Sequence, residues 1–276
     1  MTNVLTVGSL FAGIGGFDLG LTRAGFEIAW QVEIDPYCQR VLAKHWPHVQ
    51  RYGDIRTIDW GTVEPVDLLC GGFPCQDISL AGKGAGLAGE RSGLWFEYAK
   101  AIEVLKPRYV LIENVSALRS RGLDRVLGSL AAIGYDAEWH CIPASAVGAP
   151  HRRDRVWIVA YSKCAGLERR IAFSESLTSS RYGDVADAIQ QQRDRWMHWT
   201  CGWEREPQEA LQDARGRGRQ EAWMSIPESL LGRVAHGVPH RVDRLRGLGN
   251  AVVPQIVQWL GERIMRVERE NLHRMQ

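Results

Sequence analysis

Two side chains with catalytic potential follow apolar, strand-like segments of this 276-residue sequence. Cys75 comes shortly after the apolar run at residues 66–70, inside the segment 71–79, and a polar, glycine-rich loop at residues 76–93 follows it. A free thiol has a pKa of about 8.5 and is only a few per cent thiolate at neutral pH, so a nucleophilic cysteine needs activation or a proton partner. Glu113, after the apolar run 109–112, carries a group that can exchange a proton. We predict a cysteine and an acid that act together, although a buried structural cysteine is the commoner case.

A glycine-rich turn at residues 11–16 follows the first apolar run. Its glycines allow the backbone to approach a ligand at the carboxyl end of a parallel sheet, but a simple tight turn would have the same composition. Glu33, at the end of the second predicted strand, can accept hydrogen bonds from both hydroxyls of a ribose. Asp54, after Gly53, lies where an adenine amino group could be bound. Together they predict an adenosine-shaped ligand; the alternatives are a solvated strand end for Glu33 and a helix cap for Asp54.

Short apolar runs alternate with helical patterns between residues 4 and 162, which predicts a doubly wound α/β domain with a parallel sheet covered on both faces. The predicted strands are 5–11, 28–33, 66–70, 109–112, 135–142 and 156–161, and the predicted helices are 17–24, 36–45, 94–105 and 123–133. Because parallel strands end at one edge, this arrangement brings Cys75 and Glu113 together.

The pattern changes at about residue 163, where periodicity fades and arginine, glutamine, glycine and tryptophan become frequent. We predict a second, smaller domain at 163–248, and a first domain made of 1–162 plus 249–276, because residues 254–268 regain an apolar helical face. Arginine suits phosphate and guanine recognition, although a GC-rich genome would give a similar composition.

Composition excludes several classes of protein. No run of about 18 apolar residues and no secretion signal occurs, so we expect a cytoplasmic protein without a membrane span. The six cysteines form no Cys-x-x-Cys pair and have no nearby histidine set, which argues against a metal site and a disulfide framework. The net charge of +2 does not by itself indicate a nucleic-acid partner.

The order and spacing of these segments resemble the DNA cytosine-5 methyltransferase family of bacteria and phages. The resemblance rests on residues 11–13, 33, 74–76, 113–115, 148–155 and 249–254. His151 stands where most members have glutamine, and no counterpart is evident for the arginine-containing segment that usually precedes the final Gly-Asn motif. The resemblance implies a Rossmann-like S-adenosylmethionine-dependent methyltransferase fold with a target-recognition domain at 163–248.

The resemblance also implies a mechanism. The Cys75 thiolate would add to carbon 6 of a cytosine, and Glu113 would hydrogen-bond the ring nitrogen beside the amino group. Arg153 and Arg155 would orient Glu113 and the cytosine carbonyl oxygen, with Arg153 as the expected catalytic contact. The alternative for either arginine is a purely structural ion pair.

The cofactor implied is S-adenosylmethionine, with Phe11 stacked on its adenine, and core packing is the alternative for the apolar members of the site. The site residues carried over are Phe11, Gly13, Glu33, Asp54, Pro74, Leu94, Asn250 and Val252.

The partner implied is double-stranded DNA, contacted by Gln76 and Ser79, from which the target base is flipped into the site. A monomer is the expected state, a cognate restriction endonuclease is a possible partner, and association with the nucleoid follows from the substrate. A tRNA cytosine methyltransferase would share the same catalytic residues and is the nearest rival. A non-catalytic DNA-binding protein would not need Cys75, and a nicotinamide-dependent oxidoreductase would leave residues 74–76 unexplained.

Overall fold

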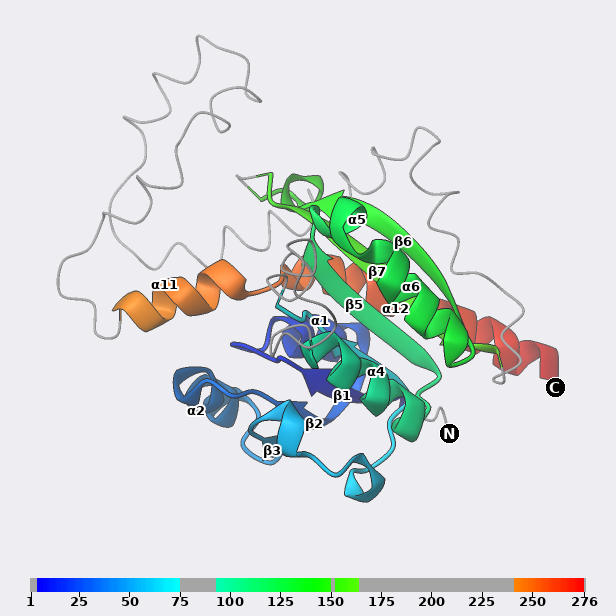
Figure 1. Ribbon diagram of the computed structural model, residues 1–276, viewed down its shortest axis with the longest axis horizontal. Coiled ribbons are helices and arrows are strands. Elements are labelled where there is room, and N and C mark those ends of the chain that lie inside the picture. The colour runs from blue at the N-terminus through cyan, green and yellow to red at the C-terminus, as the bar shows by residue number, and fades with distance from the viewer. Residues whose placement is uncertain (1–3, 75–92, 150–151, 164–240, 276) are drawn as a thin grey trace, which may run out of the picture. The chain divides into compact units, whose positions relative to one another are not determined.

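A computed structural model describes residues 4–74, 93–149, 152–163 and 241–275 (Figure 1). These residues belong to two compact units. One contains the described parts of 1–142, 154–173 and 246–276, and the other contains the described parts of 143–153 and 174–245. The predicted domain at 163–248 therefore lies almost entirely outside the described residues, and its boundaries stay a prediction.

A seven-stranded sheet forms the centre of the first unit, in the order β3-β2-β1-β4-β5-β7-β6 among the described residues (Figure 1). The strands are β1 Thr6–Leu10, β2 Glu27–Val32, β3 Gln50–Tyr52, β4 Leu68–Gly71, β5 Tyr109–Val115, β6 Tyr135–Pro143 and β7 Asp154–Ser162. All six predicted strands are confirmed, and the strand missed is β3. It has only three residues, all polar or aromatic, and lies at the edge of the sheet, so it shows no apolar run.

The sheet is mixed, so the prediction of a parallel sheet is wrong for one strand. β1 pairs in parallel with β2 and β4, and β4 with β5, but β7 runs antiparallel to β5. Residues 144–153, which join β6 to β7, contain only the short 3₁₀ helix Ala144–Val147 among their described positions. A parallel crossover needs a dozen or more residues and usually a helix, so this connection is too short for one.

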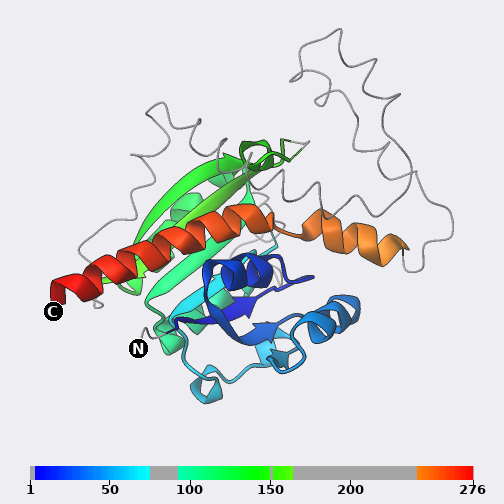
Figure 2. The same cartoon turned by 180° about the vertical axis from the view of Figure 1, so that it is seen from behind.

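Helices cover both faces of the sheet, as the sequence predicts. Figure 1 shows α4 and α6 in front of the sheet, and Figure 2 shows α1 and α12 on the opposite face. The helices are α1 Gly16–Ala24, α2 Pro36–His45, α4 Gly93–Leu105, α5 Leu118–Arg121, α6 Leu123–Ala132, α11 Arg241–Asn250 and α12 Pro254–Met275. α2 has the predicted bounds because Asp35 caps it and Pro36 occupies its first turn.

Close contact between α1 and α12 joins the two ends of the chain. A Cβ atom added at Gly20 would lie 2.5 Å from Val257 Cβ, and one added at Gly261 would lie 2.8 Å from Ala24 Cβ. Buried Glu268 then fixes α12 to the sheet, because it accepts hydrogen bonds from the Tyr109 hydroxyl at 2.6 Å and from the Arg108 guanidinium at 2.8 Å. The terminal helix is therefore part of the core of the first unit.

A buried carboxyl group lies beneath the amino-terminal turn. Asp18, on α1, accepts hydrogen bonds from Ser9 Oγ at 3.1 Å and from Gln31 Nε2 at 2.7 Å. Burial raises the pKa of Asp18 from 3.8 to about 6, and these hydrogen bonds only partly oppose the effect. The folded protein therefore holds a proton on Asp18 more tightly than the unfolded chain does.

We predict that Asp18→Asn makes the free energy of unfolding less dependent on pH. Below pH 3.8 both states of the parent are protonated at this position, and its stability falls as the pH rises through the window from 3.8 to about 6. The total loss corresponds to about 3 kcal/mol. Urea denaturation at a series of pH values from 4 to 8 would measure it. Parallel curves for parent and variant would contradict this account of Asp18.

Candidate active site

Several of the predicted site residues lie at the edge where the parallel strands end. β1, β2, β4 and β5 all point to this edge. β1, β2 and β4 lead into Phe11, Glu33 and Gly72, respectively, and Glu113 lies within β5, two residues before its end. Sheets of this type bind ligands at the carboxyl ends of their strands, because loops and helix starts provide polar groups there.

The glycine-rich turn has left-handed backbone at several positions. Gly13 has a φ of 57° and Gly15 a φ of 87°, conformations that favour glycine, whereas Phe11 adopts a φ of 52° at a cost of about 1–2 kcal/mol. Glu33 holds the turn in place, because one carboxylate oxygen accepts the Gly13 N–H at 2.7 Å and the other accepts the Asp35 N–H at 2.8 Å. This bracing role is additional to the ribose contact predicted from the sequence, which stays a prediction.

The two predicted apolar cofactor contacts lie at the margin of the core. Phe11 and Leu94 are half-buried and pack against the main hydrophobic cluster. The Phe11 ring lies 6.2 Å, centroid to centroid, from the ring of Tyr98 on α4. Part of each of these side chains therefore packs in the core, as the alternative to a cofactor contact predicts.

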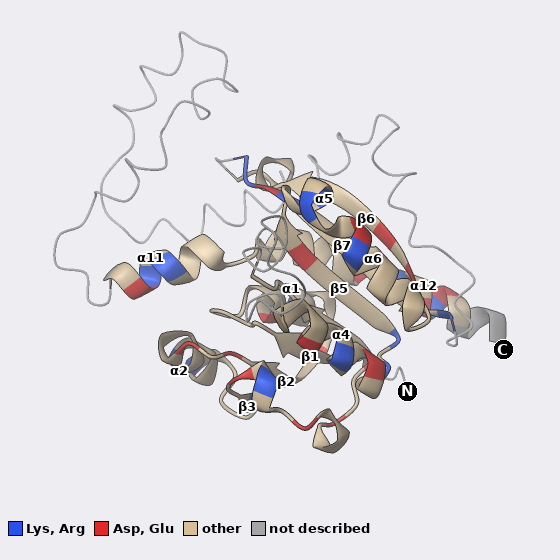
Figure 3. Ribbon diagram, viewed as in Figure 1, with Lys and Arg blue, Asp and Glu red and all other residues tan. Residues whose placement is uncertain are grey.

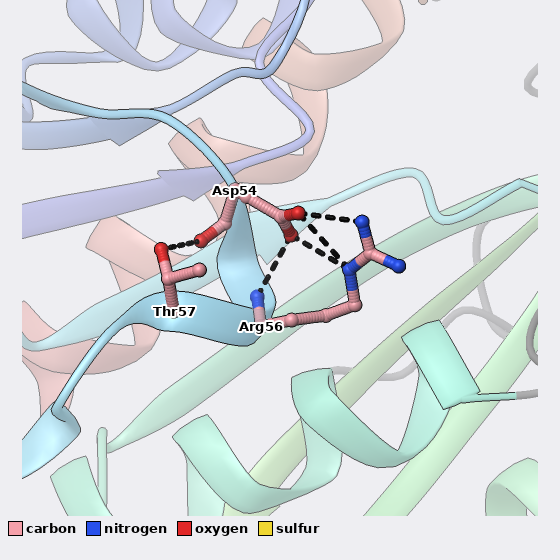
Figure 4. Close-up of polar contacts among 3 residues, drawn as sticks. All are labelled: Asp54, Arg56 and Thr57. Carbon is pink, nitrogen blue, oxygen red and sulfur yellow. Dashed lines mark hydrogen bonds and ion pairs between the residues drawn. The ribbon is translucent and has the colours of Figure 1, made fainter.

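Asp54 caps a short 3₁₀ helix, Ile55–Thr57, that follows β3. Its carboxylate accepts the Arg56 backbone N–H at 3.0 Å and also binds the Arg56 guanidinium, with a shortest distance of 2.6 Å (Figure 4). The hydrogen bonds from Arg56 lower the pKa of Asp54. The cap weighed as an alternative from the sequence is thus present, and the adenine contact stays a prediction.

The Gly-Asn segment near the end of the chain lies beside the start of α1. A Cβ atom at Gly16 would lie 2.8 Å from Val252 Cγ2 and 2.9 Å from the Val252 carbonyl oxygen. Asn250 is the last residue of α11 and is exposed. The structure therefore places Val252 next to the glycine-rich turn.

Glu113 and Arg155 form an ion pair at the edge of the sheet. Glu113, at the end of β5, is only 8% exposed, and its Oε1 lies 2.9 Å from Arg155 Nε. Arg155 is aligned opposite Val115, and its Nη1 also donates to the Asp154 carbonyl oxygen at 3.0 Å. The structure thus brings together two of the predicted catalytic residues, and their roles stay predictions.

Two neighbours of the predicted catalytic residues were not assigned roles from the sequence. A Cβ atom at Gly72 would lie 2.9 Å from Glu113 Oε2, so only glycine permits this approach of the carboxylate. Buried Asn114 donates its Nδ2 hydrogen to the Phe73 carbonyl oxygen at 2.9 Å and accepts the Val115 N–H through Oδ1. Asn114 therefore ties β5 to the segment that leads to position 75. The sequence feature that could have indicated this role is the position of Asn114 directly after Glu113, in the segment 113–115.

The remaining predicted site residues are either described apart from this ion pair or lie outside the described residues. Pro74 is exposed, and Arg153 has a φ of 37° and belongs to the second unit. Residues Cys75, Gln76, Ser79 and His151 lie outside the described residues.

The described part of the chain contains neither a candidate metal site nor a membrane-spanning helix. It holds no group of three His, Cys, Asp or Glu side chains that could bind a metal ion. None of its helices is long and apolar enough to cross a membrane. The cysteines it includes, Cys38, Cys70 and Cys141, form no disulfide bond among the described residues.

Comparison with known proteins identifies the family to which this protein belongs. The family model for C-5 cytosine-specific DNA methylases matches residues 5–226, which is more than half of the chain. The protein therefore belongs to the C-5 cytosine-specific DNA methylase family, whose members are DNA methyltransferases. This finding agrees with the resemblance seen in the sequence.

Individual relatives agree with the family. The type II methyltransferase M2.BsuMI of Bacillus subtilis is 29% identical over 94% of this chain and 75% of its own length. M.Eco47II of Escherichia coli is 38% identical over 57% of this chain, and M.HhaI of Haemophilus parahaemolyticus is 33% identical over 55%. The matches to the latter two span 40% and 47% of those relatives, which is less than half of their length.

A solved structure is similar as well. It is described as a putative DNA modification methyltransferase encoded within a prophage of E. coli. It is 27% identical with a TM-score of 0.49, over 60% of this chain and 49% of that one.

We predict that Gly72→Ala lowers the rate of methyl transfer about 100-fold, because the added methyl group would displace the Glu113 carboxylate from its place beside Arg155. Gly128→Ala is the matched control, since a Cβ atom there has no neighbour within 4 Å. Single-turnover assays on both variants, with thermal denaturation to verify folding, would measure the effect. Parent-like turnover by Gly72→Ala would show that the carboxylate tolerates displacement.

Proposed function

We propose that this protein transfers a methyl group from S-adenosylmethionine to carbon 5 of a cytosine that is flipped out of a specific double-stranded DNA sequence. The observation that supports it most directly is the buried Glu113–Arg155 ion pair, at the edge where β4 leads toward Cys75. The family membership supports the same reaction.

The strand edge suits S-adenosylmethionine in charge and backbone conformation. The turn at Phe11 and Gly13 has left-handed backbone, and a Cβ atom added at Gly13 would have no neighbour closer than 4.0 Å. The carboxylates of Glu33 and Asp54 suit a molecule with ribose hydroxyls, an amino group and a positive charge. Leu94, Pro74, Asn250 and Val252 are the other proposed contacts. When bound, this cofactor would supply an electrophilic methyl group, because its positively charged sulfonium sulfur leaves as the neutral thioether S-adenosylhomocysteine.

The chain's own residues would activate the base. The Cys75 thiolate adds to carbon 6 of the cytosine, which makes carbon 5 nucleophilic and divides one difficult step into two. Glu113 hydrogen-bonds the ring nitrogen next to the amino group and exchanges a proton there, so that the charge created by the addition is stabilised. Arg155 fixes Oε1 of Glu113 and so orients the carboxylate. Arg153 is proposed to contact the cytosine carbonyl oxygen. After the transfer, the carbon 5 proton leaves to a water molecule, and elimination of the Cys75 thiolate from carbon 6 restores the aromatic ring.

DNA would approach the same edge. Gln76 and Ser79 are proposed to contact it, and residues 163–248 to recognise the target sequence, with an unstacking cost of a few kcal/mol for the flipped base. The short helix α5, directly after β5, carries the exposed Arg119 and Arg121, and Figure 3 shows its positive charge. Such side chains suit phosphate contacts. We propose further that the protein is a monomer in the cytoplasm, associated with the nucleoid, and that it acts with or without a cognate restriction endonuclease.

Bisulfite sequencing tests the reaction. DNA from cells that express the parent chain should contain protected cytosines in one short sequence context, whereas DNA from cells with Cys75→Ser should contain none. Cys141→Ser is the matched control, because Cys141 lies on β6 and has no proposed role. Methylation by Cys75→Ser at the parent level would overturn the covalent mechanism. Protection in the tRNA pool but not in DNA would overturn the DNA substrate in favour of RNA.

We also predict salt-sensitive DNA binding. Affinity should fall about 100-fold or more between about 50 mM and about 200 mM salt if four or more phosphates are contacted. The double variant Arg119→Ala/Arg121→Ala should reduce the slope of log affinity against log salt by about 1 to 2. Arg23→Ala, an exposed arginine at the end of α1, is the control. Fluorescence anisotropy with a labelled duplex measures the slope, and a flat affinity would exclude phosphate contacts as the main source of binding.

A further inference from the structure

Arg56 forms an extensive side-chain contact with Asp54 at the proposed cofactor edge. Its Nη2 lies 2.6 Å from Asp54 Oδ2, and its Nε lies 3.0 Å from both carboxylate oxygens (Figure 4). The Arg56 backbone N–H donates to Asp54 Oδ1 as well, and Thr57 Oγ1 donates to the Asp54 carbonyl oxygen at 2.9 Å. Arg56 therefore holds the carboxylate of Asp54, and Thr57 holds its backbone carbonyl.

Stability does not account for this arrangement. The Arg56 side chain is 57% exposed and the Asp54 side chain 23% exposed, and ion pairs this accessible to water contribute little to folding. The pair joins residues only two positions apart, so it closes no long loop. Its main physical effect is to fix the direction in which the Asp54 carboxylate points.

The contacts also limit what Asp54 can bind. A carboxylate has about four acceptor positions on its two oxygens, and three N–H groups of Arg56 take up about three of them. About one position is left for a further donor. A single N–H of an amino group matches this geometry, whereas a carbonyl oxygen would face a carboxylate and be repelled.

Hydrogen bonds connect the end of β3, just before Asp54, to the glycine-rich turn after β1. The Glu33 N–H donates to the Tyr52 carbonyl oxygen at 3.0 Å, and Asp54 follows Tyr52 by two residues. The Glu33 carboxylate in turn accepts the Gly13 N–H. These two hydrogen bonds link the glycine-rich turn, the end of β2 and the end of β3, and the chain then continues for two residues to Asp54.

We propose that Arg56 is a positioning residue that fixes the Asp54 carboxylate to accept one N–H of the purine amino group, and that it thereby makes the site selective for 6-amino over 6-oxo purines. This inference rests on the proposed function, because it assumes that an adenosine-containing cofactor binds at this edge. Arg56 acts through Asp54 and does not itself touch the ligand.

Calorimetric titration of the purified full chain tests the proposal. The probes are S-adenosylhomocysteine, which carries the 6-amino group, and its 6-oxo counterpart S-inosylhomocysteine. Arg56→Ala should weaken binding of the first probe about tenfold, since a fixed charged acceptor is lost, and should leave the weak binding of the second nearly unchanged. Selectivity between the probes should therefore fall. Arg56→Lys should recover only part of the affinity, because an ammonium cannot form the two-point contact. Arg23→Ala should bind both probes as the parent does.

A double-mutant cycle separates positioning from a general structural role. In an Asp54→Asn background, Arg56→Ala should cause no further loss of affinity if it acts through Asp54. An unchanged affinity and selectivity of Arg56→Ala in the parent background, or the same loss with and without Asp54, would overturn the inference while the proposed function stands. No binding of S-adenosylhomocysteine by the parent chain would overturn the proposed function together with this inference.

Discussion

The ion pair between Glu113 and Arg155 depends on the direction of one strand. β7 is antiparallel to β5, so its first residues lie beside the last residues of β5, with Arg155 opposite Val115. If β7 ran the other way, Arg155 would lie near Tyr109, about 20 Å away along the seven-residue strand β5. The reversal of a single strand therefore determines whether the buried carboxylate has a cationic partner at the ligand edge.

The three carboxylates at this edge are each oriented by hydrogen bonds from neighbouring residues of the protein. Glu33 is held by the Gly13 N–H, Asp54 by Arg56, and Glu113 by Arg155. A polar group that already points in its working direction does not have to reorganise when charge develops or a ligand arrives. The left-handed turn at Gly13 is part of this arrangement, because the residue whose N–H donates to the Glu33 carboxylate adopts that backbone conformation.

Sequence patterns predict the local elements better than the contacts between them. The buried strands have apolar runs, and α2 has a capping Asp35 and a proline, so their positions could be inferred directly. The direction of β7 and the strand β3 depend on pairing between distant segments, which no local pattern records. The same holds for the Gly13–Glu33 contact and for the clash that a side chain at residue 72 would cause, because both need the register of different strands.

The proposed cofactor edge depends on contact between segments that lie far apart in the sequence. Val252 packs on Gly16 at the start of α1, and α12 holds this contact in place because Glu268 fixes the helix to Tyr109 on the central strand β5. Contacts between such distant segments form only after a large loop closes, which costs chain entropy and slows folding. The packed form of the glycine-rich turn, with Val252 against Gly16, therefore depends on this loop closure. Any ligand that binds the turn only in this form stabilises the packed helix by the same free energy.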